Sequence, residues 1–170
     1  MKGTPMILGM SLPLFTVVHV ALSLIGIAAG FVVLYGMIVA KRLPAVTALF
    51  LVTTALTSLT GFLFPFKGVT PGIVVGILSI IVLIVATVAL YAGHLAGIWR
   101  GTYIISTALA LYFNFFVFIV QSFEKMPALK SLAPTQSEPP FKIAQLVTLV
   151  VFVLLTTLAF RRFRLVPSVA

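Results

Sequence analysis

Residues 72–98 read GIVVGILSIIVLIVATVALYAGHLAGI. This stretch contains no Lys, Arg, Asp or Glu, and it is longer than the roughly 20 apolar residues that a helix needs to cross the hydrocarbon core of a bilayer. It also lacks proline, which would remove a backbone hydrogen bond that lipid does not replace. The stretch therefore predicts a transmembrane helix.

Similar apolar stretches lie on both sides of it. We predict five transmembrane helices, at residues 13–40, 43–66, 72–98, 102–123 and 141–160. The prolines fall at or outside the predicted ends, as expected for helices that must satisfy their own backbones in lipid. A β-barrel is excluded because the apolar runs are too long and do not alternate. The predicted fold class is an all-α integral membrane protein, an antiparallel bundle of five transmembrane helices forming one domain over residues 1–170.

The composition agrees with this class. Hydrophobic residues make up 62% of the 170 positions and charged residues only 8%, which is far from the range of soluble domains. The net charge of +9 does not indicate nucleic acid, because the basic residues flank apolar runs and form no basic helix face. The lipid bilayer is the predicted partner. The absence of cysteine excludes disulfides and thiolate chemistry.

One connection is long, at residues 124–140, and it contains both acidic residues, Glu124 and Glu138. Its scattered apolar residues leave two alternatives open, a solvated linker or a short amphipathic cap at the membrane interface. The other predicted turns are short, so the first four helices should pack as antiparallel neighbours in sequence order.

The positive-inside rule gives the predicted orientation. The C-terminal side of the bundle receives six Lys and Arg residues, Lys41, Arg42, Arg100, Arg161, Arg162 and Arg164, and the other side receives five, Lys2, Lys67, Lys125, Lys130 and Lys142. We therefore expect a cytoplasmic C-terminus and a periplasmic N-terminus in a bacterial-type inner membrane. The first apolar run is too long for a signal-peptide core and is expected to remain in the protein.

Small and polar residues recur at helical spacing on three of the predicted helices. They form the stripes His19, Ser23, Gly26 and Gly30; Thr47, Thr54, Ser58 and Gly61; and Tyr103, Thr107, Ala110, Asn114 and Gln121. Such stripes should face protein rather than lipid. Glycines spaced by four residues predict close helix packing at Gly26 and Gly30, Gly72 and Gly76, and Gly93 and Gly97.

The alternating direction of the helices places several polar residues at similar depth in the half nearer the N-terminal side. They suggest a polar pocket lined by His19, Thr57, Thr60, Asn114, Gln121 and Gln145, with Glu124 and Glu138 in a loop that covers it. Interhelical hydrogen bonding is the alternative role for the same residues.

No catalytic or cofactor motif accompanies these residues. His19 and His94 would lie about 24 Å apart in depth, at 1.5 Å per residue, so they cannot bind one haem. No metal-ligand spacing or catalytic constellation is present, and we predict no cofactor and no enzymatic activity. Two functions remain open: a structural or accessory component of a homo-oligomer or larger membrane complex, and a binder or carrier of a small lipophilic or polar molecule.

Overall fold

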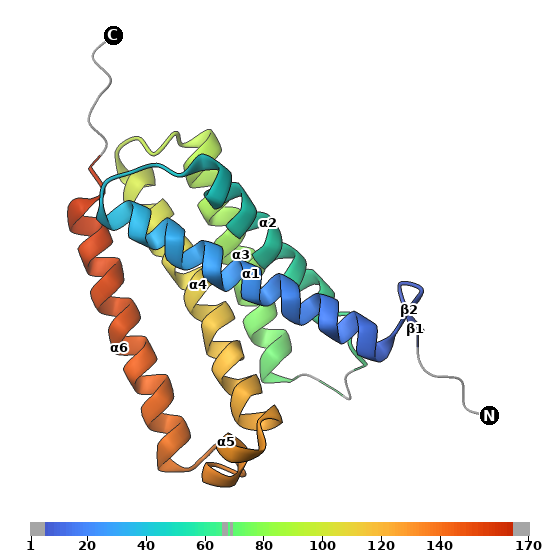
Figure 1. Cartoon of the computed structure of the whole chain (residues 1–170). Coiled ribbons are helices and arrows are strands. Elements are labelled where there is room, and N and C mark those ends of the chain that lie inside the picture. Colours follow the sequence, from blue (N-terminus) through green and yellow to red (C-terminus); the bar gives the residue numbers. More distant parts are fainter. Residues whose placement is uncertain (1–5, 66–67, 69, 165–170) are drawn as a thin grey trace.

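A computed structural model describes residues 6–65, 68 and 70–164. Five long helices dominate it: α1 (Leu12–Ile38), α2 (Pro44–Gly61), α3 (Pro71–Thr87), α4 (Ile98–Lys125) and α6 (Pro139–Arg162) (Figure 1). The shorter elements are a hairpin of β1 (Met6–Ile7) and β2 (Met10–Ser11), a π-helix η1 (Val88–Ala92) that continues α3, and α5 (Pro127–Leu132). The sequence pattern did not indicate the hairpin.

Within the described residues, five helices, with η1 counted as part of α3, are long and apolar enough to cross a membrane. The predicted fold class is confirmed, and the chain is a multi-pass membrane protein. Four of the five spans have proline at the first or second helical position, where a backbone N–H would have no partner within the helix. The exception is α4, which begins at Ile98 directly after Gly97.

Two predicted boundaries are wrong. The second span ends at Gly61 rather than at residue 66. The third predicted span, 72–98, is helical only to Ala92, and the chain then turns through Gly93–Gly97. His94, Leu95 and Gly97 have positive φ values of 48°, 59° and 52°, which no α-helix contains. Hydrophobicity does not distinguish this turn from a helix, because its residues are as apolar as those before it.

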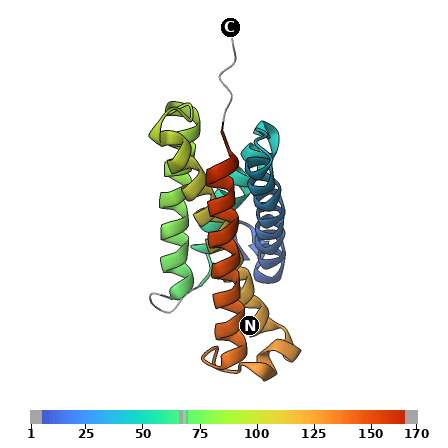
Figure 2. The same ribbon diagram turned by 90° about the vertical axis from the view of Figure 1, so that its left-hand side faces the viewer.

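The helices alternate in direction, so the bundle has two faces. We call the C-terminal face the end at which α1 and α6 end, α2 and α4 begin, and η1 lies; the opposite end is the N-terminal face. The predicted neighbour packing is confirmed for α1 with α2, α2 with α3 and α3 with α4. In addition α1 contacts α4, and α6 packs against both of them, so α4 is the central helix. Figure 2 shows α6 in front, between α3 and α1.

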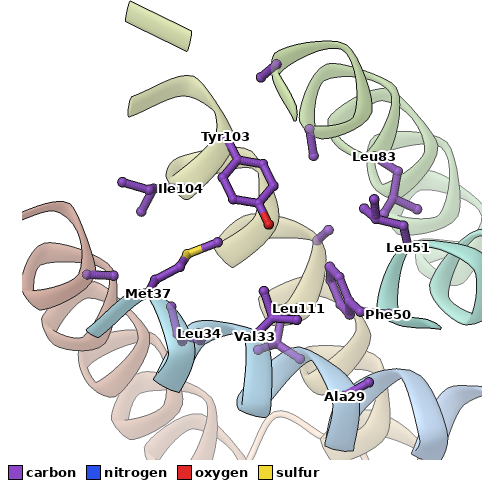
Figure 3. Packing of buried hydrophobic residues seen from close by; sticks show 14 of the residues in the cluster. Ala29, Val33, Leu34, Met37, Phe50, Leu51, Leu83, Tyr103, Ile104 and Leu111 are labelled. Atoms are coloured by element: carbon purple, nitrogen blue, oxygen red, sulfur yellow. The ribbon is translucent and has the colours of Figure 1, made fainter. Parts of the chain in front are cut away.

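The buried core lies where α1, α2, α3 and α4 meet in the half nearer the C-terminal face. Phe50, Ile104 and Leu111 have no solvent-exposed surface, and Tyr103 is 3% exposed. In Figure 3 the hydroxyl of Tyr103 points into this cluster, between α1 and α2. The core thus includes a polar atom at the side of the bundle where the basic residues gather.

The connection at residues 124–140 is ordered rather than a plain linker. It contains α5, which packs against α4. Gln136 Nε2 donates to the carbonyl of Val120 at 3.0 Å, and the rings of Phe123 and Phe141 lie 5.4 Å apart. These contacts hold the connection across the ends of α4 and α6 at the N-terminal face.

Candidate functional site

The middle parts of the polar stripes predicted on α1, α2 and α4 face one another. Ser23 Oγ of α1 donates to Asn114 Oδ1 of α4 at 2.7 Å. A Cβ on Gly26 would lie 3.0 Å from Thr54 Oγ1 and 3.2 Å from Asn114 Nδ2, so three helices approach closely at this glycine. We call this contact between α1, α2 and α4 the polar seam.

His19 and Thr60 join α1 to α2 near the N-terminal face, where His19 Nδ1 lies 2.8 Å from Thr60 Oγ1. Thr60 Oγ1 also donates to the carbonyl of Leu56 at 2.7 Å. Because the threonine proton is engaged there, the imidazole is the donor to Thr60. The ring of His19 also meets Phe64 edge-on, with centroids 5.1 Å apart.

The structure does not gather all six predicted pocket residues into one pocket. His19 pairs with Thr60, and Asn114 lies in the polar seam with Ser23. Thr57 Oγ1 donates to the carbonyl of Thr53 in its own helix at 2.8 Å. Two amides bond elsewhere: Gln121 Nε2 to Glu124 Oε2 at 3.3 Å on the exposed surface, and Gln145 Nε2 to the carbonyl of Phe116 at 3.3 Å.

The two glutamates of the predicted lid also bond locally. Glu124 is exposed and forms an ion pair with Lys125 at 3.3 Å. Glu138 Oε1 accepts from Thr135 Oγ1 at 2.8 Å, and its Oε2 accepts from the backbone N–H of Ser137 at 3.0 Å. The hydrogen bonds of these carboxylates stay within the connection and the end of α4, and the one predicted pocket residue that they reach is the exposed Gln121.

The predicted packing glycines differ in their surroundings. Gly26 and Gly30 lie at the polar seam, and a Cβ on Gly30 would lie 2.5 Å from Leu111 Cδ1. Gly76 faces Phe62 beyond the end of α2, and Gly93 packs against Trp99 within the turn before α4. Gly72 is near only Thr70, and Gly97 faces open space, so neither lies at a helix–helix contact.

A cavity of about 280 Å³ opens at the C-terminal face, which sequence reasoning did not identify. Its mouth carries Lys41, Arg42 and His94, and its deeper wall includes Thr47 and Tyr103. The remaining lining is Val33, Met37, Leu43, Pro44, Leu90, Tyr91, Leu95 and Phe163. We call it the basic cavity, because all its charged lining residues are basic. The sequence signal that could have indicated it is the absence of Asp and Glu near Lys41, Arg42 and Arg100.

The backbone around the basic cavity is strained. His94 and Leu95 are consecutive left-handed residues, and Ala40, beside the lining residue Lys41, has φ 55°. The π-helix η1 supplies Leu90 and Tyr91. Non-glycine residues with positive φ cost about 1–3 kcal/mol each, and single π-turns occur often at functional sites. Their concentration around one cavity makes the basic cavity the best candidate site.

Two buried hydroxyls on the facing helices α2 and α4 have no hydrogen-bond partner, that of Thr54 in the polar seam and that of Thr107 beside Tyr103. Both residues are 1% exposed. Most serines and threonines of these helices donate to a carbonyl one turn earlier, as Thr53 does to Leu49 at 2.7 Å. A buried hydroxyl without a partner costs about 1–3 kcal/mol, so these two need an explanation.

A second, more open cavity of about 560 Å³ lies between α3, α4 and α6, beside Arg100. Arg100 Nη1 donates to the carbonyls of Phe163 at 2.7 Å and Phe160 at 3.1 Å, and its guanidinium lies 5.2 Å from the Phe160 ring centre. Arg100 thereby binds the carbonyl end of α6, which carries partial negative charge.

Within the part of the chain that the structure describes, no group of three or more His, Cys, Asp or Glu side chains is arranged to hold a metal ion. No protein-family model, curated protein or solved structure matches the chain.

Proposed function

We propose that this protein is a non-enzymatic membrane protein that binds an anionic, phosphate-bearing group in the basic cavity. The observation that carries the proposal is a cavity of about 280 Å³ whose charged lining residues are Lys41 and Arg42, with no acid among the lining residues. Lys and Arg donors bind phosphate strongly through charge-assisted hydrogen bonds.

The rest of the lining indicates an amphiphile. Polar groups stand at the mouth of the basic cavity, and Val33, Met37 and Leu95 lie along its inner wall. Pockets for small molecules combine such apolar walls with a few oriented polar groups. A headgroup phosphate at the mouth, with an apolar portion inside, fits this arrangement. A soluble phosphorylated molecule shares the headgroup chemistry but leaves the apolar wall unused.

The proposed location is a bacterial-type inner membrane with the C-terminal face in the cytoplasm. This orientation gives the side with more Lys and Arg to the cytoplasm. The basic cavity then opens toward the leaflet in which anionic lipids create a negative surface potential.

Native mass spectrometry of the detergent-solubilised protein tests the proposal. The probes are phosphatidylglycerol, phosphatidylcholine and inorganic phosphate, each titrated separately. The Lys41→Gln/Arg42→Gln variant should weaken phosphatidylglycerol binding about tenfold, which corresponds to about 1.4 kcal/mol. Arg161→Gln/Arg162→Gln removes the same charge from the same face outside the cavity lining and is the matched control. The proposal would be overturned if the Lys41→Gln/Arg42→Gln variant bound phosphatidylglycerol as tightly as the unmodified protein does, or if the control variant lost as much affinity. Phosphate competing as well as the lipid would identify a soluble ligand.

An accessory component of a homo-oligomer or larger membrane complex is the second candidate. The observation that favours it is that two spans are little buried. Only 17% of the most apolar segment of α6, and 22% of the corresponding segment of the α3 span, is buried inside the bundle. Whole faces of these helices are thus available to lipid or to a partner helix. The same spectra report the mass of the assembly, and a monomer would count against a homo-oligomer.

A further inference from the structure

The polar seam continues inward from the basic cavity. Thr47 and Tyr103, which line the cavity, lie beside Thr107. Farther from the cavity, Ser23, Thr54 and Asn114 gather around Gly26. One set of buried polar groups therefore faces the cavity, and a second set lies nearer the N-terminal face.

A single apolar layer separates the two sets. It consists of Phe50 and Leu111, both without exposed surface, packed on Gly30. Figure 3 shows these two side chains below the ring of Tyr103. On α4, Leu111 is four residues from Thr107 and three from Asn114, or about 6 Å and 4.5 Å along the helix axis. The layer is thus about one side chain thick.

The two unpartnered hydroxyls lie on opposite sides of this layer, Thr107 beside the cavity-lining Tyr103 and Thr54 beside Gly26. Each is a buried polar atom that lacks the usual bond to its own helix. Both can therefore serve a small species that enters the seam, without first breaking a hydrogen bond within the protein.

The chemistry of the seam favours an anion. Hydroxyl and amide groups supply N–H and O–H donors, and the basic residues stand at the cavity mouth. The two glutamates of the chain lie at the N-terminal face in the long connection or beside it, and each bonds locally there. A pore without carboxylates and with a basic entrance selects against cations.

We propose that the polar seam is a pathway for small inorganic anions such as chloride, closed in this structure by Phe50 and Leu111. Apolar constrictions of this kind close pores because water does not fill them. The inference rests on the proposed function in that the anion-binding basic cavity is the entrance to the pathway.

Flux into liposomes that contain a chloride-sensitive dye tests the gate. Phe50→Ala should raise chloride uptake at least tenfold over the unmodified protein, and adding Thr54→Val and Thr107→Val should reverse most of that gain. Leu49→Ala, one residue earlier on the 47%-exposed outer side of α2, is the matched control. Potassium uptake should stay unchanged. A Phe50→Ala flux equal to that of Leu49→Ala, or equal potassium and chloride fluxes, would overturn the inference.

Cysteine labelling keeps the test decisive if Phe50→Ala does not fold. The chain contains no cysteine, so single Thr54→Cys and Leu49→Cys variants each carry one thiol. Thr54 lies beyond the apolar layer, so a small water-soluble methanethiosulfonate reaches it from the cavity only through the pathway, and it should modify Thr54→Cys at least tenfold faster than Leu49→Cys, which faces lipid. Equal rates would overturn the inference. Phosphatidylglycerol binding in the same preparations is a separate measurement, so loss of the pathway and loss of headgroup binding are distinguishable.

Discussion

Gly30 is the residue at which α1 meets both Phe50 of α2 and Leu111 of α4. A Cβ at this position would lie 2.5 Å from Leu111 Cδ1 and 2.8 Å from Phe50 Cε2, and both neighbours are fully buried. Gly30→Ala should therefore destabilise the folded protein by about 1–3 kcal/mol through overpacking. Thermal unfolding in detergent, followed by circular dichroism, measures the change.

Gly72→Ala is the control for this prediction. A Cβ on Gly72 meets only Thr70 Oγ1, at 3.7 Å. Because alanine favours helix by up to about 1 kcal/mol over glycine, this variant should unfold at the same temperature or higher. If both variants lower the midpoint equally, the contact at Gly30 is not the cause.

Arg100 connects two elements, the start of α4 and the end of α6. Its two hydrogen bonds to the carbonyls of Phe160 and Phe163 satisfy groups that a helix leaves without partners at its last turn. Arg100→Gln should lower the free energy of local opening of that turn by about 1 kcal/mol. Hydrogen exchange of the Phe163 N–H, which donates to the carbonyl of Ala159 at 2.8 Å, should then quicken about fivefold. Arg161→Gln, on the same exposed turn, should leave the rate unchanged.

Glu138 fixes the turn that precedes α6. Desolvation raises the pKa of Glu138, but hydrogen bonds from Thr135 and from the backbone of residues 135, 137 and 138 together outweigh it and hold the pKa below 4.5. A carboxyl whose pKa is lower in the folded state stabilises the folded turn at pH values above its unfolded-state pKa. That stabilisation is lost as the pH falls through its folded-state pKa. Amide exchange at Thr135 and Ser137, corrected for its intrinsic pH dependence, should therefore quicken below pH 4.5. Glu138→Gln should exchange quickly at every pH.

The elements also show how far the sequence predicts this fold. Stripes such as His19, Ser23 and Gly26 follow helical periodicity, so the sequence alone predicted which faces of these helices turn toward protein, although Gln121 at the end of the α4 stripe is exposed. The turn at Gly93–Gly97 was missed, since left-handed backbone at His94 and Leu95 has no hydrophobic signature. The basic cavity was missed because its lining extends from Val33 to Phe163, and periodicity within one helix does not report contacts between distant segments.

At the scale of the whole molecule, the proposed orientation rests on the charge difference between the two sides predicted from the sequence. Six Lys and Arg residues on the C-terminal side against five on the other is a narrow margin, and Arg161, Arg162 and Arg164 contribute half of the larger number. In a bacterial host, a fluorescent protein that matures only in the cytoplasm should be bright when fused to the C-terminus. Alkaline phosphatase, active only in the periplasm, should be inactive at the same position.

The narrow margin makes a second outcome testable. Changing all three of these arginines to glutamine leaves three basic residues against five, so the positive-inside rule then favours the opposite orientation. A substantial fraction of the triple variant should show phosphatase activity at its C-terminus. Changing Lys125, Lys130 and Lys142 to glutamine instead leaves six against two and should strengthen the original orientation. If the triple arginine variant keeps a fully cytoplasmic C-terminus, the interior packing of the helices rather than the terminal arginines determines the orientation. The positive-inside rule then no longer supports the proposal that the basic cavity opens toward the cytoplasm.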